Sequence, residues 1–155
     1  MKIQIGGNVA KRPSTWIVVY DLSKDRILVL KRAKHVNNPN LWNFPGGGID
    51  GQDPRLASKR ELFEEAGVKC KKSDLVFLAK NKEKDTHYYL LPVASEPKLR
   101  VSSKESSAYK WITSQELRRL GEKLHRKTAV FALSKAAMAR LDAIIRTVRS
   151  ANKPK

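Results

Sequence analysis

The chain has 155 residues, of which 41% are hydrophobic and 30% are charged, a balance that predicts one globular domain and excludes a disordered chain. No stretch approaches the roughly 18 consecutive apolar residues of a membrane span, and residues 1–10 lack the layout of a secretory signal, so a cytoplasmic protein is expected. The single cysteine excludes an internal disulfide. The net charge of +17 indicates polyanionic partners such as nucleotides or RNA, with a generic basic surface as an equal alternative.

The first half of the chain predicts two strands, a loop and a helix. Residues 15–20 and 26–30 are rich in β-branched and aromatic residues and predict two adjacent buried strands. Residues 35–51 contain Asn-Asn-Pro-Asn and Pro-Gly-Gly-Gly and predict a loop, interrupted by the apolar residues of 41–44. Asp53 is a suitable N-cap, Pro54 suits the first helical position, and Gly67 is placed to end the helix.

The second half predicts further strands and a long helical region. Residues 75–79, 87–94 and 110–112 read as strands, and Thr113 or Ser114 caps a helix over 115–120. Residues 123–149 have apolar positions at near-helical spacing with Lys and Arg between them, which predicts a long basic C-terminal helix that frays from Ser150. Strands mixed with helices predict an α/β or α+β class, with one domain over residues 1–150 and a disordered tail over 151–155.

Three glutamates on the first predicted helix carry the strongest chemical signal. Glu61, Glu64 and Glu65 stand at positions i, i+3 and i+4, which places their carboxylates on one helix face. Like charges at this spacing destabilise an exposed helix by about 0.3 kcal/mol per pair. A divalent cation between them reverses this effect, and Mg²⁺ takes oxygen ligands and bridges carboxylates to phosphates. The alternative for three glutamates taken alone is an ordinary solvated acidic face.

The surrounding residues resemble the Nudix box. Residues 60–68, Arg-Glu-Leu-Phe-Glu-Glu-Ala-Gly-Val, match the second half of that pattern at every position. The first half is irregular. Counted from Gly47, one residue is missing before Arg60; counted from Gly46, the spacing is kept but the family's glutamate is absent. The residues that can take over from this glutamate are Asp50, Gln52 and Asp53.

The resemblance covers roughly residues 14–120 and implies a fold and an activity. It includes the strands before the box, Leu-Trp-Asn-Phe-Pro-Gly-Gly at residues 41–47, and a later glutamate and tryptophan-bearing strand over residues 105–111. The implied fold is a Nudix-type α/β/α sandwich with a mixed sheet, to which the basic C-terminal helix is an addition. The implied activity is Mg²⁺-dependent cleavage of a pyrophosphate bond in a nucleotide by water attack on phosphorus, with Mn²⁺ as an alternative ion.

The resemblance also assigns roles to individual residues. The implied metal ligands are Gly47, through its carbonyl, Glu61, Glu64 and Glu65. Glu61 is implied as metal ligand or general base, Arg60 as the residue that orients it, and Glu105 as a further ligand or base. The expected site also contains aromatic residues that stack on a nucleobase and cations that bind phosphates. It further contains a glycine that lets the backbone lie close to the substrate. These substrate-binding candidates are Lys31, Arg32, Trp42, Phe44, Gly46 and Tyr89.

Three functions remain open at this point. The lead-in at residues 41–47 favours a MutT-type hydrolase of nucleoside di- or triphosphates. The basic C-terminal helix favours an RNA 5′-end pyrophosphohydrolase or decapping enzyme, whose RNA binding would weaken steeply with salt. The irregular first half of the box favours a catalytically silent Nudix domain that binds nucleotide or nucleic acid. The oligomeric state is also open, because an alanine-rich face packs either on its own core or on a second copy in a homodimer. That face is made of Ala132, Ala136 and Ala139.

Overall fold

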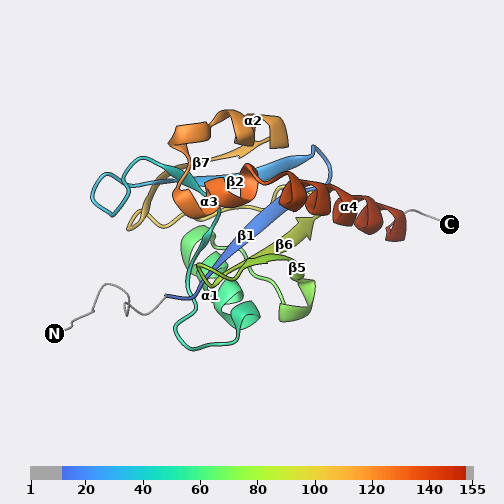
Figure 1. Cartoon of the computed structure of the whole chain (residues 1–155), viewed down its shortest axis with the longest axis horizontal. Coiled ribbons are helices and arrows are strands. Elements are labelled where there is room, and N and C mark those ends of the chain that lie inside the picture. The colour runs from blue at the N-terminus through green and yellow to red at the C-terminus, as the bar shows by residue number, and fades with distance from the viewer. Residues whose placement is uncertain (1–11, 153–155) are drawn as a thin grey trace.

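The computed structural model describes residues 12–152, which form a mixed sheet with helices on both faces (Figure 1). The sheet has seven strands in the order β3-β2-β1-β6-β5, with β4 added beside β1 and β7 beside β2. Residues 1–10, which bear on the expectation about a secretory signal, and residues 153–155 of the expected tail lie outside the described residues. The elements are β1 Ser14–Asp21, β2 Arg26–Arg32, β3 Trp42–Asn43, β4 Gly46–Gly48, α1 Pro54–Ala66, β5 Val76–Asn81, β6 Thr86–Val93, β7 Ser106–Ile112, α2 Ser114–Arg119, α3 Arg126–Ala132 and α4 Lys135–Ala151, with single 3₁₀ turns at Lys72–Asp74 and Gly121–Lys123.

Strand β1 is the centre of the sheet and is buried along its whole length. It pairs with β6 in parallel over eight residues, and with β2 in antiparallel fashion where Tyr20 faces Ile27. At its other end it pairs with the glycine strand β4. A strand that is covered on both faces has a nearly continuous apolar sequence, as residues 15–20 do.

Two hydrophobic cores lie on opposite faces of the sheet, which confirms the expected α/β/α sandwich. Because side chains alternate along a strand, Val18 joins the core beneath α2, α3 and α4, whereas Ile17 and Val19 join the core beneath α1. Helix α1 contributes Leu62 and Ala66 to the second core, and both are fully buried. The opposite face of α1 is thereby left to carry the glutamates.

Helix α1 begins and ends where the sequence predicts. The Asp53 carboxylate accepts a hydrogen bond from the Leu56 N–H at 3.1 Å, and Pro54 opens the helix. Gly67 ends it in the left-handed conformation with φ of 72°, and its N–H donates to the Phe63 carbonyl. A residue with a Cβ adopts this φ with difficulty, so glycine is the residue that allows a clean stop.

The predicted helix over residues 123–149 is wrong as a single element. Helix α3 ends at Ala132, and α4 begins at Lys135 after Ser134, whose hydroxyl accepts from the Ala137 N–H at 3.1 Å. No glycine or proline marks this break, and a serine inside an amphipathic pattern is not a strong stop signal. Helix α4 also continues through Ala151, so the expected fraying from Ser150 is not found.

Other boundaries also differ from the sequence-based expectation. Strand β7 begins at Ser106 rather than at residue 110, and the glycines expected in a loop form β4. Thr113 rather than Ser114 caps α2, in a capping box with Glu116. Of the alanine-rich face, Ala132 is buried in the chain's own core while its two helical neighbours Ala136 and Ala139 are exposed. Between residues 12 and 152, no helix has the length and apolar character needed to cross a membrane.

Candidate active site

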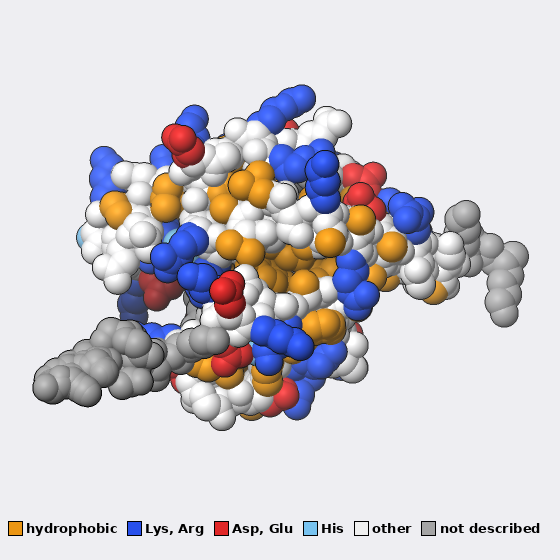
Figure 2. Space-filling view, in the orientation of Figure 1, with side chains coloured by type: hydrophobic (Ala, Val, Ile, Leu, Met, Phe, Trp, Pro, Cys, Tyr) orange, Lys and Arg blue, Asp and Glu red, His pale blue; other side chains and the backbone are white. Residues whose placement is uncertain are grey.

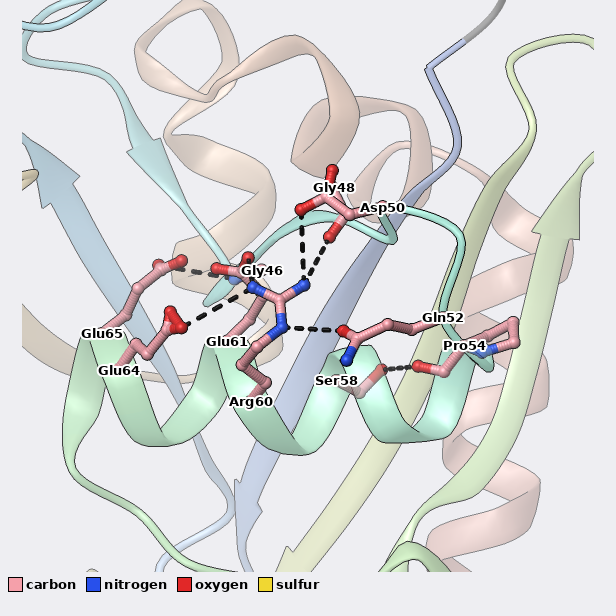
Figure 3. A network of polar contacts seen from close by, with 10 residues as sticks. All are labelled: Gly46, Gly48, Asp50, Gln52, Pro54, Ser58, Arg60, Glu61, Glu64 and Glu65. Atoms are coloured by element: carbon pink, nitrogen blue, oxygen red, sulfur yellow. Dashed lines mark hydrogen bonds and ion pairs between the residues drawn. The ribbon is translucent and has the colours of Figure 1, made fainter.

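The three glutamates of α1 face the glycine strand β4 and differ sharply in burial (Figure 3). The Glu64 side chain is 53% exposed and that of Glu61 is 14% exposed. Glu65 is buried, with 7% of its surface exposed. A solvated acidic face would leave all three carboxylates in water, so the graded burial argues against that alternative.

Glu65 is a buried carboxylate with too few partners. One oxygen lies 3.5 Å from the Gly46 N–H, and the other, Oε2, has no hydrogen-bond partner. Burial raises the pKa of Glu65 well above its usual range, and the neighbouring Glu61 and Glu105 raise it further. Burial likewise raises the pKa of Glu61. An ionised carboxylate in this position requires a proton or a cation to offset its desolvation.

Arg60 holds the more exposed pair of glutamates. Its Nη1 donates to Glu61 Oε1 at 3.0 Å and lies 3.6 Å from Glu64 Oε1. A guanidinium makes such charge-assisted contacts in a fixed geometry, so it fixes the direction of the carboxylate that it touches. The expected contact between Arg60 and Glu61 is therefore present.

The other edge of the Arg60 guanidinium contacts the loop that leads into α1 (Figure 3). Nε donates to Gln52 Oε1 at 2.8 Å, Nη2 donates to the Gly48 carbonyl at 3.1 Å, and Asp50 lies 3.6 Å away. Asp53 instead caps α1 and pairs with a lysine at 3.2 Å. Of the three candidates to replace the family's glutamate, Gln52 and Asp50 therefore contact Arg60, whereas Asp53 caps the helix.

Glu105 reaches the same site from a distant part of the chain. The loop before β7 is fastened to the loop after β2, because the Ala33 N–H donates to the Glu105 carbonyl at 2.8 Å and the His35 ring contacts the Lys104 carbonyl at 2.7 Å. A cavity of about 360 Å³ is lined by the three α1 glutamates together with Ser102, Lys104 and Glu105. An adjoining cavity of about 480 Å³ shares Glu61 and Glu105 and is lined by β4 and Arg32.

Residues 10–132 match the family model of the NUDIX domain. The chain belongs to the NUDIX domain family. Over 98 residues, 63% of this chain and 75% of the relative, it is 32% identical to the 8-oxo-dGTP diphosphatase of Buchnera aphidicola subsp. Schizaphis graminum. Over 76 residues, 48% of this chain, it is 37% identical to the RNA pyrophosphohydrolase of Roseobacter denitrificans. It spans 45% of that relative's length, and less than half the length of several others that it matches.

The solved structures agree with the Nudix fold. The NUDIX domain of Shewanella oneidensis NrtR, in a complex with ADP ribose, superposes with a TM-score of 0.66 at 19% identity. The superposition covers 88% of this chain and 92% of the other. At this level of identity the likeness supports the fold alone, and the chemistry rests on the residues of this chain.

Two of the expected substrate-binding aromatic residues are core residues. Phe44 is fully buried and packs edge to face on Phe131 at 5.8 Å between ring centroids. Tyr89 is 4% exposed, and the Arg55 guanidinium lies 5.0 Å from the centre of its ring. The structure therefore gives neither ring an exposed face on which a nucleobase could stack. A buried aromatic residue and a stacking platform look alike in a single sequence.

The remaining substrate-binding candidates lie nearer the surface. Trp42 is half-buried, with the ammonium groups of Lys31 and Lys110 at 5.9 Å and 4.4 Å from its ring centre. Arg32 lines the cavity that holds Glu61, and its Nε donates to the Asn37 carbonyl at 2.6 Å. Gly46 is buried, its N–H lies 3.5 Å from Glu65 Oε1, and it also lines the cavity that holds Glu61 and Glu105.

The residues of this site fit a divalent cation, although the glutamate side chains do not converge on a single point. Within residues 12–152, no three His, Cys, Asp or Glu side chains converge into a ready-made metal site. Arg60 instead holds Glu61 and Glu64. The unpartnered Oε2 of Glu65 is one sign of a fit. A second is Gly47, where a Cβ would lie 2.8 Å from the Glu61 carboxylate, so only glycine leaves that space open.

We predict that Gln52 positions Arg60 during the reaction. Replacing Gln52 by alanine removes the 2.8 Å contact to Nε, and we expect kcat to fall about tenfold because a hydrogen bond to a charged group contributes about 1.5 kcal/mol. In contrast, Gln52→Glu should keep kcat at or above that of the unsubstituted protein, because a carboxylate makes a stronger, charge-assisted contact with Arg60. Steady-state kinetics of both variants test this, and an unchanged kcat in Gln52→Ala would rule out the role.

Proposed function

We propose that the chain hydrolyses a pyrophosphate bond of a nucleoside di- or triphosphate with the help of a divalent cation. The observation that carries this proposal is the buried Glu65 carboxylate, which lacks a partner for Oε2 beside a cleft shared with Glu61 and Glu105. Membership of the Nudix family and the relative named as a diphosphatase support the same reaction.

The proposed ligands of the cation are the carboxylates of Glu61, Glu64 and Glu65 and the carbonyl of Gly47. All are oxygen donors, which suits Mg²⁺, with Mn²⁺ as an alternative. When bound, the cation supplies a more acidic water and neutralises charge on the phosphoryl oxygens. Two of these proposed ligands, Glu61 and Glu64, contact the Arg60 guanidinium in the structure.

The chain's own residues supply the proton acceptor and its orientation. Partial burial raises the pKa of Glu61, and its carboxylate, which lines the cavity, is the first candidate for the general base. Arg60 fixes its direction through the 3.0 Å contact. Glu105 faces the same cavity from the opposite loop and is the second candidate for this proton. The expected products are a nucleoside monophosphate or diphosphate and the remaining phosphate fragment.

We predict that Mg²⁺ raises the melting temperature, and raises it more as the pH increases. The folded-state pKa of Glu65 is raised, so folding takes up a proton, and without metal the free energy of unfolding falls as the pH rises through that pKa. Cation binding requires the ionised form and offsets this loss. At a hundred times its Kd, the cation adds about 2.7 kcal/mol.

Calorimetry between pH 5.5 and 8.5, with Mg²⁺ or with a chelator, measures this linkage. Glu65→Gln should abolish most of the pH-dependent difference between the two conditions, because an amide does not titrate. A metal-induced shift that is equal at both ends of the pH range would contradict the proposed role of Glu65.

The substrate is tested by a panel of nucleoside triphosphates, dinucleoside polyphosphates and 5′-triphosphate RNA, each with Mg²⁺ and with Mn²⁺. We expect release of pyrophosphate or phosphate from the free nucleotides, with little dependence on salt. Turnover restricted to RNA and lost at high salt would favour RNA 5′ ends instead. Binding without turnover of any member would identify a catalytically silent nucleotide-binding domain.

An RNA 5′ end is the second candidate substrate, supported by the net charge of +17 and by the relative named as an RNA pyrophosphohydrolase. The basic helix α4 gives it less support than its sequence suggested. This helix packs on the sheet face opposite α1 (Figure 1). Its Arg149 donates to the Leu22 carbonyl at 2.7 Å and pairs with Asp25 at 2.6 Å, so that charge fastens the helix to the β1–β2 turn.

A further inference from the structure

A second hollow, of about 970 Å³, opens beside the glycine strand β4, next to the proposed catalytic cleft. Its lining includes Trp16, Gly47 and Gly48, and the same three residues line the cavity that holds Glu61 and Glu105. The two spaces therefore meet along β4. The Glu61 and Asp50 carboxylates stand over Gly47 and Gly48 at this junction.

The lining of this hollow is strongly cationic. Arg12, Lys84, Arg126 and Lys127 all contribute to it. Among residues 12–152, none of these four has a carboxylate within the 4.0 Å of an ion pair. The acidic residues of the lining are Asp50, which lies against Arg60, and Glu83. Figure 2 shows Lys and Arg side chains gathered at the lower edge of α3.

Lys127 lines this space and is held in place by three hydrogen bonds. Its ammonium donates to Thr86 Oγ1 at 3.0 Å, its carbonyl accepts from the Tyr88 hydroxyl at 2.6 Å, and its N–H donates to His125 Nδ1 at 3.2 Å. Partial burial lowers the pKa of Lys127, and the positive charges of Arg126 and Lys84 lower it further. An anion between these groups would relieve both effects.

The wall behind the cations is aromatic and uncharged. Trp16 and His125 pack in a tilted arrangement with 5.5 Å between ring centroids. Burial lowers the pKa of His125 to about 4, so its ring is neutral near pH 7. Both rings are almost fully buried, so neither offers a face for a nucleobase. A weakly polar wall strengthens charge interactions beside it, which favours phosphate as the occupant over a base.

We propose that this hollow is an anion subsite that binds substrate phosphates other than the one attacked. The inference rests on the proposed hydrolase function and adds a selection rule to it: substrates whose phosphates extend beyond the cleaved bond bind more tightly. Those phosphates are either the rest of a nucleotide's polyphosphate chain or the internucleotide phosphates of an RNA. Lys127 and Arg126 are the specificity-determining residues, with Lys84 at the rim.

Binding of inorganic tripolyphosphate to the full chain, without divalent metal and at low salt, tests the subsite separately from catalysis. Without metal the carboxylate site repels anions, so calorimetric binding reports on the hollow. We expect Lys84→Gln with Arg126→Gln, both exposed positions, to weaken Kd at least tenfold, and Lys127→Gln to weaken it further. The matched control is Arg118→Gln with Arg119→Gln on α2, which removes the same charge and should leave Kd within twofold.

Kinetics with metal then identify the source of the phosphate. The Lys84 and Arg126 variant should raise KM with little change in kcat. A rise for nucleoside triphosphates points to the polyphosphate chain, and a rise confined to 5′-triphosphate RNA points to the internucleotide phosphates. Unchanged tripolyphosphate affinity together with unchanged KM would overturn the subsite while leaving the hydrolase proposal intact. Affinity lost in the variants of a chain that hydrolyses nothing would reject the hydrolase and keep the anion site.

Discussion

Replacing Glu65 by glutamine is expected to lower Mg²⁺-dependent hydrolysis by about a hundredfold to ten-thousandfold without destabilising the protein. The change removes a proposed metal ligand but keeps the shape of the side chain and its contact with the Gly46 N–H. Because the pKa of Glu65 is raised in the folded state, this carboxyl group lowers the free energy of unfolding of the metal-free protein as the pH rises. The amide carries no such charge, so the melting temperature in chelator should stay the same or rise.

Two further variants make this result interpretable. Glu64→Gln should also reduce turnover strongly, although Glu64 is 53% exposed and its replacement should not change the melting temperature. Glu96→Gln alters an exposed glutamate outside the site and should leave both activity and stability unchanged. Full activity in both Glu65→Gln and Glu64→Gln would remove the basis of the proposed metal site.

Gly46→Ala is expected to destabilise the fold by about 3 kcal/mol and to lower the melting temperature by about 10 °C. A Cβ at this position would lie 2.2 Å from the Thr15 carbonyl and 2.6 Å from the Trp16 ring. Both belong to β1, the strand at the centre of the sheet, which cannot move without disturbing its other pairings. Strand β4 would therefore have to separate from β1, which also withdraws the N–H that faces Glu65.

The neighbouring Gly48→Ala is the matched control for this effect. Its Cβ would meet the Asp50 carboxylate at 2.9 Å, and that side chain is 75% exposed and free to turn away. Thermal unfolding should therefore show a change below about 1 kcal/mol. Equal losses in the two variants would mean that β4 tolerates neither side chain for a reason other than the contact with β1.

The glycine strand β4 and helix α1 form one unit because backbone groups of β4 make hydrogen bonds to side chains of α1. Strand β4 brings an N–H to Glu65 and a carbonyl to Arg60, at 3.5 Å and 3.1 Å. Helix α1 is anchored to the sheet by Leu62 and Ala66, which leaves the acidic face turned to the glycines. Substitutions in β4 should therefore change the position of the glutamate carboxylates on α1, although the glutamates themselves are not replaced.

Short-range sequence patterns were sufficient to predict the family, the central strands and helix α1. Asp53, Pro54 and Gly67 determine where α1 starts and stops through contacts within a few residues, so these boundaries follow from sequence. The i, i+3, i+4 spacing places the glutamates on one face for the same reason. The break between α3 and α4 and the burial of Phe44 depend on packing between distant segments, and no local pattern marks them.

The tertiary structure alone decided how the site is completed. Gln52 lies 2.8 Å from Arg60 Nε because folding brings the irregular first half of the box back over the helix. The same applies to Glu105 beside Glu61, and to Lys127 in the hollow beyond β4. The sequence by itself determined which acidic side chains share a face; burial, which controls the charge of Glu65, arises only when the sheet, the glycine strand and the later loop close around it.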